Sequence, residues 1–243
     1  MSGEGRTALV TGAASGIGAA IAARLERDAW DVLTVDVRGE VGFRADLTSR
    51  EGNRAAVATA FERFGRLDAV IPNAGFQHVA PIEEFPEERW DAILALLLTS
   101  PFLLARYAWP HLRASGAGRY VAIASVHGLV ASPYKAAYVA AKHGVLGLVK
   151  TLALEGAAHG ISASAVCPAY VRTPLVEGQI VDQAKAHGLP EDRVLEDVIL
   201  ARQAVKRLIE PEEVAATVAF LLGPDARAFT GVPVVMDQGW SAR

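Results

Sequence analysis

The chain has 243 residues, of which 51% are hydrophobic and 21% are charged, and its formal net charge at pH 7 is −3. These values indicate a compact globular protein that is long enough for one large α/β domain, and they exclude a disordered chain. The small negative charge offers no broad basic surface to nucleic acid or to an anionic membrane, so we expect small molecules or further copies of the chain as partners.

Short β-branched runs alternate with alanine-rich helical stretches along the whole chain. In chain order they predict a strand at Arg6–Val10, a helix at Gly18–Arg27, a strand at Asp31–Val37, a helix at Arg50–Phe64, a strand at Ala69–Ile71, a helix at Glu87–Arg113, a strand at Tyr120–Ala124, a helix at Tyr138–His159, a strand at Ser162–Val166, a helix at Glu212–Leu222 and a strand at Val232–Met236. The strands are nearly continuous apolar runs, which indicates a central parallel sheet covered by helices on both faces. We therefore predict the α/β class, with a single doubly wound Rossmann domain over residues 1–243.

One segment, residues 170–206, interrupts this alternation between a strand and the last helix. It is polar, with apolar residues at helical spacing that include Leu195, Ile199 and Leu200. Its place at the carboxyl edge of the sheet predicts a helical substrate lid. A pair of surface helices with no mobile role is the alternative.

The cysteine count and the absence of targeting signals bear on the cellular location of the protein. Cys167 is the only cysteine, which excludes a disulfide framework or a multi-cysteine metal site within one chain, so we predict no metal and a cytoplasmic location. The first residues lack the basic and apolar layout of a signal peptide. The most apolar stretch, Ala92–Ala105, is interrupted at Thr99–Pro101, and we expect it to be too short to span a membrane.

The sequence TGAASGIG, residues 11–18, follows the first strand and opens the first helix. Glycines at such a place let the backbone turn sharply and let its N–H groups approach a pyrophosphate at the helix N-terminus. The spacing of the three glycines differs from the general dinucleotide fingerprint, and an ordinary glycine-rich turn is the alternative. The order of strand, turn and helix favours phosphate binding.

Two aspartates that follow predicted strands are candidates for contacts with a nucleotide. Asp36 ends the second strand, where a carboxylate can accept hydrogen bonds from the hydroxyls of an adenine ribose; a simple turn residue is the alternative. A 2′-phosphate there would meet a like charge, which favours NAD over NADP, although the nearby Arg38 is a feature that suits NADP. Asp46 either receives the adenine amino group or caps the helix that starts near Ser49.

Tyr138 and Lys142 are four residues apart at the start of a predicted helix, so their side chains share one face. A phenol has a reference pKa of about 10, and a neighbouring ammonium together with a positive nicotinamide ring would stabilise the phenolate. Ser125 closes the preceding strand and can orient a carbonyl oxygen. The pattern predicts Tyr138, Lys142 and Ser125 as catalytic residues, with an interfacial tyrosine beside a solvated lysine as the alternative.

These features together resemble the short-chain dehydrogenase/reductase family over nearly the whole chain. The resemblance rests on the TGAASGIG turn, on residues 73–75 (NAG), on Ser125, on Tyr138 with Lys142, and on Pro168 and Thr173. It implies NAD as the cofactor, held by Gly12, Ser15, Gly16, Ile17, Gly18, Asp36, Asp46, Leu47, Asn73, Ala74, Gly75, Tyr138, Lys142, Pro168, Val171 and Thr173.

Within that family the chain is similar to the bacterial D-3-hydroxybutyrate dehydrogenases. The similarity lies in residues 76–81 (FQHVAP), 124–130 (ASVHGLV), 173–177 (TPLVE) and 239–243 (GWSAR). It implies a cytoplasmic homotetramer of ketone body metabolism whose substrate-binding residues are Gln77, Ser125, His127, Lys135, Tyr138, Tyr170 and Gln179. This set is chemically reasonable, because a short hydroxy acid needs hydrogen-bond donors for its carboxylate.

The chain departs from the family pattern at three places. Leu97 stands where the family usually carries an asparagine that is linked by water to the catalytic lysine. Pro133 and Tyr134 replace the residues expected before Lys135. Tyr170 stands where the hydroxybutyrate enzymes place a tryptophan, so an aromatic wall is kept but becomes smaller and gains a hydroxyl. These departures leave the reaction type in place and the substrate open.

The resemblance implies an oxidoreductase that interconverts (R)-3-hydroxybutyrate and acetoacetate by NAD-dependent hydride transfer, with Tyr138 as acid/base. Two alternatives stay open. A related enzyme acting on another secondary alcohol or ketone is suggested by Tyr134 and Tyr170. A non-catalytic NAD-binding protein of the same fold is suggested by Leu97, and such a protein would bind NADH without turnover.

Self-association is suggested by the predicted helix that contains Ala92–Trp109. This stretch is apolar around most of its circumference, which is more than one face of a sheet can cover. Burial against another subunit is the expected outcome. A larger core within a monomer is the alternative.

Overall fold

A computed structural model of the protein describes residues 5–178, 180 and 190–242. These residues form a seven-stranded sheet in the order β3-β2-β1-β4-β5-β6-β7, in which every neighbouring pair is parallel. The strands are β1 (Arg6–Thr11), β2 (Trp30–Asp36), β3 (Phe43–Arg44), β4 (Ala69–Ile71), β5 (Arg119–Ile123), β6 (Ser162–Pro168) and β7 (Pro233–Met236). The predicted doubly wound fold is confirmed.

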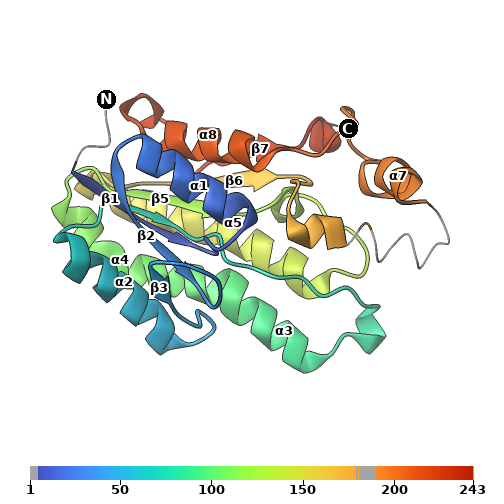
Figure 1. The fold of residues 1–243 in the computed structure, drawn as a ribbon, viewed down its shortest axis with the longest axis horizontal. Helices are drawn as coiled ribbons and strands as arrows, with labels where there is room; N and C mark the ends of the chain where they lie inside the picture. The colour runs from blue at the N-terminus through green and yellow to red at the C-terminus, as the bar shows by residue number, and fades with distance from the viewer. Residues whose placement is uncertain (1–4, 179, 181–189, 243) are drawn as a thin grey trace.

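Helices cover both faces of the sheet (Figure 1). They are α1 (Gly16–Arg27), α2 (Arg50–Phe64), α3 (Glu87–Leu94), α4 (Ser100–Ala114), α5 (Ala136–Gly156), α7 (Glu191–Val194) and α8 (Pro211–Leu222). α1 and α8 lie on one face, and α2, α4 and α5 lie on the other. Successive side chains of β1 alternate between the two layers, so that Leu9 packs with α2 and α4 while Ala8 and Val10 pack with α1 and α8.

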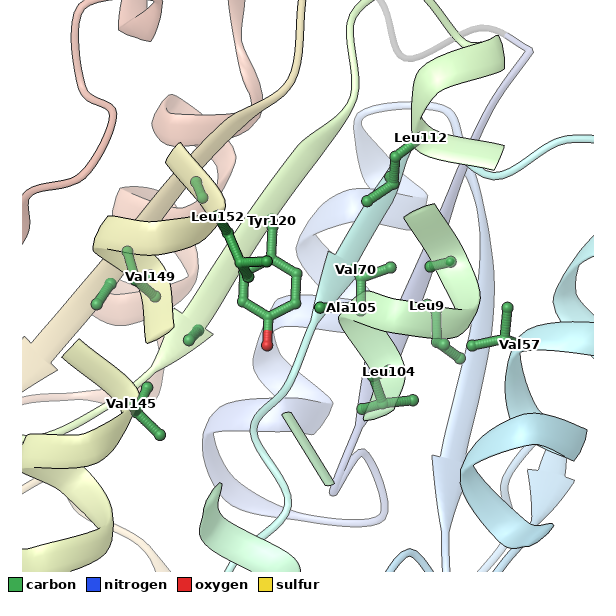
Figure 2. Close-up of a cluster of buried hydrophobic side chains, with 14 of the residues drawn as sticks. Leu9, Val57, Val70, Leu104, Ala105, Leu112, Tyr120, Val145, Val149 and Leu152 are labelled. Carbon is green, nitrogen blue, oxygen red and sulfur yellow. The ribbon is translucent and has the colours of Figure 1, made fainter. Parts of the chain in front are cut away.

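The larger core lies between the sheet and the layer of α2, α4 and α5. Figure 2 shows Tyr120 of β5 at its centre, close to Val149 and Leu152 of α5. Tyr120 is fully buried, and its hydroxyl donates a hydrogen bond to the carbonyl oxygen of Pro101 at 2.8 Å. Burial also raises the pKa of Tyr120, so the phenol keeps its proton.

Each predicted strand and helix is present, with ends that differ from the prediction by at most three residues. One strand and one irregularity of the long helix were not predicted, nor were the short 3₁₀ helices. β3 consists of two residues, Phe43–Arg44, which is too short for any side-chain pattern to show. The predicted helix over Glu87–Arg113 contains a π-helical turn at Ala95–Thr99. The sequence did not predict this turn, because the side-chain pattern does not report which carbonyl each N–H reaches.

The apolar helical run from Glu87 to Ala114 is continuous, and by length and composition alone it could cross a membrane. The expectation that residues 99–101 would interrupt it is wrong, because Thr99 ends a π-helical turn that runs directly into Ser100 and Pro101 of α4. The fold explains the apolar composition differently. This run packs on the sheet, and 44% of its most apolar window is buried inside the protein.

The described part of segment 170–206 has a small core of its own. Residues 174–178 are helical, α7 continues into a π-helical turn at Leu195–Ile199, and Tyr170 packs against a cluster that includes Val176, Ile199 and Leu200. The apolar spacing noted in the sequence therefore reflects local packing. Gln179 lies outside the described residues, and a mobile lid stays a prediction.

Removing the hydroxyl of Tyr120 tests the buried contact between β5 and α4. We expect Tyr120→Phe to lower the free energy of unfolding by about 1–2 kcal/mol, because the carbonyl of Pro101 loses its donor inside the core. Urea denaturation followed by circular dichroism measures this. Tyr107→Phe on the same helix layer is the control, since Tyr107 is only partly buried, and equal losses in the two variants would contradict the expectation.

Candidate active site

A cleft of about 480 Å³ opens at the carboxyl ends of the central strands, where the strand order reverses between β1 and β4. This is the place at which doubly wound folds bind ligands. With the exception of Gly18, every residue that the sequence assigned to the cofactor lines the cleft: Gly12, Ser15, Gly16, Ile17, Asp36, Asp46, Leu47, Asn73, Ala74, Gly75, Tyr138, Lys142, Pro168, Val171 and Thr173. Ser125 lines it as well.

The glycine-rich turn is fixed by contacts that exclude a larger side chain. Gly12 and Gly16 have φ of +66° and +55°, a backbone conformation that favours glycine. A Cβ atom on Gly12 would lie 2.7 Å from the Cα of Ala74, and one on Gly18 would collide with the carbonyl oxygen of Gly12. The turn therefore brings backbone against backbone, and it leaves the N-terminus of α1 facing the cleft, where it can bind a phosphate group.

Thr11 and Asn73 connect the glycine turn to the end of β4. The side-chain Nδ2 of Asn73 donates to the carbonyl oxygens of Thr11 at 2.9 Å and Gly12 at 3.2 Å. The hydroxyl of Thr11 accepts from the backbone N–H groups of Asn73 and Ala74. These reciprocal bonds satisfy buried polar groups at the floor of the cleft and hold its two walls in register.

Asp36 at the end of β2 has the turn role that the sequence offered as an alternative, and its contact with a ribose stays a prediction. Its Oδ2 accepts from the N–H of Ala14 in the glycine turn at 3.2 Å, and its Oδ1 accepts from the N–H groups of Val37 and Arg38. The carboxylate thus organises a turn and also lines the cleft. Ionised carboxylates have capacity for further donors, so contacts to ribose hydroxyls are compatible with these bonds.

Asp46 is not the cap of α2. Ser49 is the N-cap residue, and its hydroxyl accepts from the N–H of Gly52 at 2.9 Å. Asp46 instead accepts from the N–H and hydroxyl of Thr48, at 2.9 and 2.7 Å, and lines the cleft. Of the two roles considered for Asp46, the structure favours the one at the cleft.

Ser125, Tyr138 and Lys142 meet at the inner end of the cleft. Ser125 is the second residue after β5, and Tyr138 and Lys142 lie in the first two turns of α5. The ammonium of Lys142 donates to the carbonyl oxygen of Ile123 at 2.7 Å and lies 5.5 Å from the ring centre of Tyr138. The predicted catalytic residues are therefore side by side.

Burial governs the protonation of these groups. It raises the pKa of Tyr138, and a hydrogen bond with Ser125 lowers that pKa only in part. It lowers the pKa of Lys142 to about 8, since the ammonium is cut off from water. The protein's own residues thus leave the phenol pKa raised, and its lowering by an ammonium together with a positive nicotinamide ring stays a prediction.

Lys135, His127 and Tyr170 form a second polar group beyond Tyr138. Lys135 precedes α5 and is 8% exposed, and its ammonium donates to the hydroxyl of Tyr170 at 3.4 Å. The imidazole of His127 meets the ring of Tyr138 edge-on, 5.9 Å between centres. Burial and the nearby Lys135 lower the pKa of His127 to about 4, so the ring is neutral at pH 7.

Sequence reasoning assigned no role to Trp240 and Ser132, which complete this group. Trp240 is buried, stacks on Tyr170 with 5.8 Å between ring centres, and meets His127 edge-on at 5.4 Å. The hydroxyl of Ser132 lies 2.9 Å from Nε2 of His127. Trp240 belongs to the GWSAR ending whose resemblance was noted, but a contact with a residue 70 positions earlier leaves no local pattern.

Three further residues that the sequence predicted for the site are Gln77, Pro168 and Thr173. Gln77 follows the lining residue Phe76, but it does not itself line the cleft. The backbone of Pro168 accepts from the hydroxyl of Ser125 at 3.5 Å, and Thr173 approaches the Cβ position of Gly16 to 3.0 Å. Among the described residues, no group of three or more His, Cys, Asp or Glu side chains is arranged to hold a metal ion.

Leu97 lies in the π-helical turn, 2% exposed, in an apolar cluster with Ala137, Ala141 and the edge of Tyr138. Its Cδ2 is 2.6 Å from the Cβ position of Gly75. A separate cavity of about 10 Å³, roughly the size of one water molecule, lies between Leu97 and Lys142. The position where the family resemblance implies an asparagine is therefore apolar, and Lys142 has a small space beside it.

Comparison with known proteins agrees with this architecture. The family model described as enoyl-(acyl carrier protein) reductase matches residues 12–241. A D-beta-hydroxybutyrate dehydrogenase of Rhizobium meliloti is 44% identical and one of Cupriavidus necator is 40% identical, with 98% and 99% of this chain and 99% of each relative covered. A crystal structure of an actinorhodin polyketide ketoreductase with NADPH superposes with a TM-score of 0.91 at 33% identity, over 98% of both chains.

The chain therefore belongs to the short-chain dehydrogenase/reductase family, as its motifs indicated. It is an oxidoreductase that acts on CH–OH groups or the corresponding ketones, with a nicotinamide cofactor. The relatives named above place it near the hydroxybutyrate dehydrogenases within that family.

The closest backbone approach in the glycine turn can be tested by adding one methyl group. We expect Gly18→Ala to lower both the melting temperature and the affinity for NADH, the latter at least tenfold, because the new Cβ has no space beside the carbonyl of Gly12. Gly147→Ala in α5 is the control, since nothing lies within 4 Å of its Cβ position and alanine favours a helix. Scanning calorimetry and quenching of tryptophan fluorescence measure the two effects, and an unchanged NADH affinity in Gly18→Ala would disprove the steric argument.

Proposed function

We propose that the protein is an NAD-dependent dehydrogenase that interconverts (R)-3-hydroxybutyrate and acetoacetate. The observation that carries this proposal is the buried ammonium of Lys135. Among the described residues, no carboxylate pairs with Lys135, and a buried charge without a counter-charge is costly. A substrate carboxylate supplies that charge, and Lys135 lies one helical turn before Tyr138.

In this proposal the chain's own residues position the substrate and move one proton. Ser125 and Tyr138 hold the substrate oxygen by hydrogen bonds, and Tyr138 accepts the hydroxyl proton when the alcohol is oxidised. Lys135 and the neutral His127 hold the carboxylate end, while Trp240 closes the site against water. Because Tyr138 must be unprotonated to act as a base, oxidation speeds up as the pH rises, and reduction shows the opposite trend.

The residues of the cleft fit a nicotinamide dinucleotide. The N-terminus of α1 and the glycine turn suit the pyrophosphate, Asp36 suits the adenine ribose, and Lys142 suits the second ribose. A bound oxidised nicotinamide supplies a hydride acceptor and a positive charge. A positive charge beside Tyr138 opposes the effect of burial, which raises the phenol pKa.

Three further features complete the proposal. We infer one cofactor-binding domain over residues 1–243, in which residues 170–206 form the substrate lid. The exposed Phe102 on α4 and Leu154 on α5 suit burial in a homotetramer, which light scattering tests. The buried, free Cys167, whose pKa burial raises to about 11, suits a reducing cytoplasm and a role in ketone body metabolism there.

The choice of NAD over NADP depends on Asp36. We expect the wild-type enzyme to have a kcat/KM for NAD at least tenfold above that for NADP, because a 2′-phosphate would lie against this carboxylate. Asp36→Ser should lower the ratio about tenfold or more, since Arg38 then faces the phosphate without competition. Asp31→Asn, at an exposed position of the same strand, is the control, and a wild-type preference for NADP would refute this assignment.

The substrate is tested with (R)-3-hydroxybutyrate and the neutral 2-butanol, each supplied with NAD. We expect kcat/KM to be much higher for the acid, and Lys135→Met to lower it at least thirtyfold for the acid while leaving 2-butanol unchanged. Lys150→Met, an exposed lysine of α5, is the control. Tyr138→Phe should lower kcat about 10²–10⁴-fold for both.

Three outcomes would overturn the proposal. Equal activity on the acid and on 2-butanol would indicate an enzyme for another secondary alcohol. An equal effect of Lys135→Met on both substrates would show that Lys135 does not bind the substrate carboxylate. Binding of NADH without turnover of either substrate, and with no change in Tyr138→Phe, would indicate a non-catalytic protein.

A further inference from the structure

The hydroxyl of Tyr170 and the ammonium of Lys135 are 3.4 Å apart. The two residues come from different segments, Lys135 from the loop before α5 and Tyr170 from the turn after β6. The ammonium lies 5.4 Å from the ring centre of Tyr170, so it is nearer to the hydroxyl than to the aromatic face. The pair is therefore joined by a hydrogen bond.

The hydrogen-bond inventory of this pair leaves one proton without an acceptor. A lysine ammonium only donates, so the oxygen of Tyr170 is the acceptor and its own O–H points elsewhere. Among the described residues, none accepts from this hydroxyl. Burial raises the pKa of Tyr170, which keeps the phenol protonated at neutral pH. Tyr170 is thus a donor beside a second donor.

The position of Tyr170 is fixed on both sides. Its carbonyl oxygen accepts from the N–H of Ile209 at 2.9 Å, and its ring stacks on Trp240 at an interplanar angle of 21°. Trp240 is held in turn by Asp237, whose carboxylate accepts from the N–H groups of Gly239 at 3.0 Å and Ser241 at 2.7 Å. A donor held this firmly loses little entropy when it binds a ligand.

We propose that the hydroxyl of Tyr170 binds the substrate carboxylate together with Lys135, one donor to each carboxylate oxygen, and so determines specificity for acids. This inference rests on the proposed function. Two adjacent donors, one charged and one neutral, match a planar anion with two equivalent oxygens. A carboxamide or an ester presents only one such oxygen and no charge, so the pair discriminates against both.

The test is the binding of butyrate and butyramide to the enzyme with saturating NAD, followed by calorimetry. We expect Tyr170→Phe to weaken the binding of butyrate about tenfold or more, since a hydrogen bond to a charged group is lost while the stacked ring stays. The weaker binding of butyramide should change less than twofold. Tyr107→Phe, a tyrosine of α4 distant in sequence from both loops, is the matched control and should bind both ligands as the wild type does.

Turnover adds a second readout on the same variants. For (R)-3-hydroxybutyrate, Tyr170→Phe should raise KM about tenfold with kcat within twofold of the wild type, and KM for 2-butanol should stay unchanged. An unchanged butyrate affinity in Tyr170→Phe would refute the inference, and so would equal losses for butyrate and butyramide. Failure of the proposed function appears differently, as a wild-type enzyme with no preference for the hydroxy acid.

Discussion

The hydrogen bonds between Thr11 and Asn73 hold together the two segments on which the site is built. They join the ends of β1 and β4, the neighbours between which the chain reverses its direction of travel across the sheet. The Cβ positions of Gly12 and Gly18 lie 2.8 and 2.6 Å from the amide nitrogen of Asn73, so this one side chain also requires glycine at both places. The glycine turn and the segment after β4 are therefore a single structural unit. These contacts fix the N-terminus of α1 relative to the residues that follow β4.

The features that sequence predicted well are those encoded within a few residues. The turn after the first strand and the shared face of Tyr138 and Lys142 depend on local spacing, and the structure shows both arrangements. Contacts across the fold were not predictable in the same way. Trp240 reaches Tyr170 because β6 and β7 are neighbours in the sheet, and only the strand order reveals that. The π-helical turn at Ala95–Thr99 was not predictable for a different reason, since apolar side chains fit an α-helix and a π turn equally well.

Two buried lysines give the site its electrostatic character. Lys142 donates to a backbone carbonyl and Lys135 to a phenol, so both partners are neutral and neither cancels the charge. The cost of burying these ammonium groups appears as lowered pKa values, to about 8 for Lys142. An anionic or electron-rich ligand offsets this desolvation penalty when it binds, which makes its binding more favourable. His127, whose pKa burial and the nearby Lys135 lower to about 4, is neutral at pH 7 and so adds no further positive charge beside Lys135.

Leu97 bears on the way a proton taken up by Tyr138 in the proposed reaction could leave the site. A leucine has no group that can carry a proton, and its side chain belongs to an apolar cluster against which Tyr138 packs. The next helical turn, however, places Ser100 at the small cavity beside Lys142, with its hydroxyl donating to Asn53 at 2.6 Å and its lone pairs unclaimed by that bond. Lys142 has three N–H donors, of which one reaches the carbonyl of Ile123. Ser100, three residues beyond the position at which the family resemblance implies an asparagine, thus lines the same small cavity as Lys142. Lys142 is therefore not surrounded by apolar groups alone, although Leu97 stands where the family resemblance implies an asparagine.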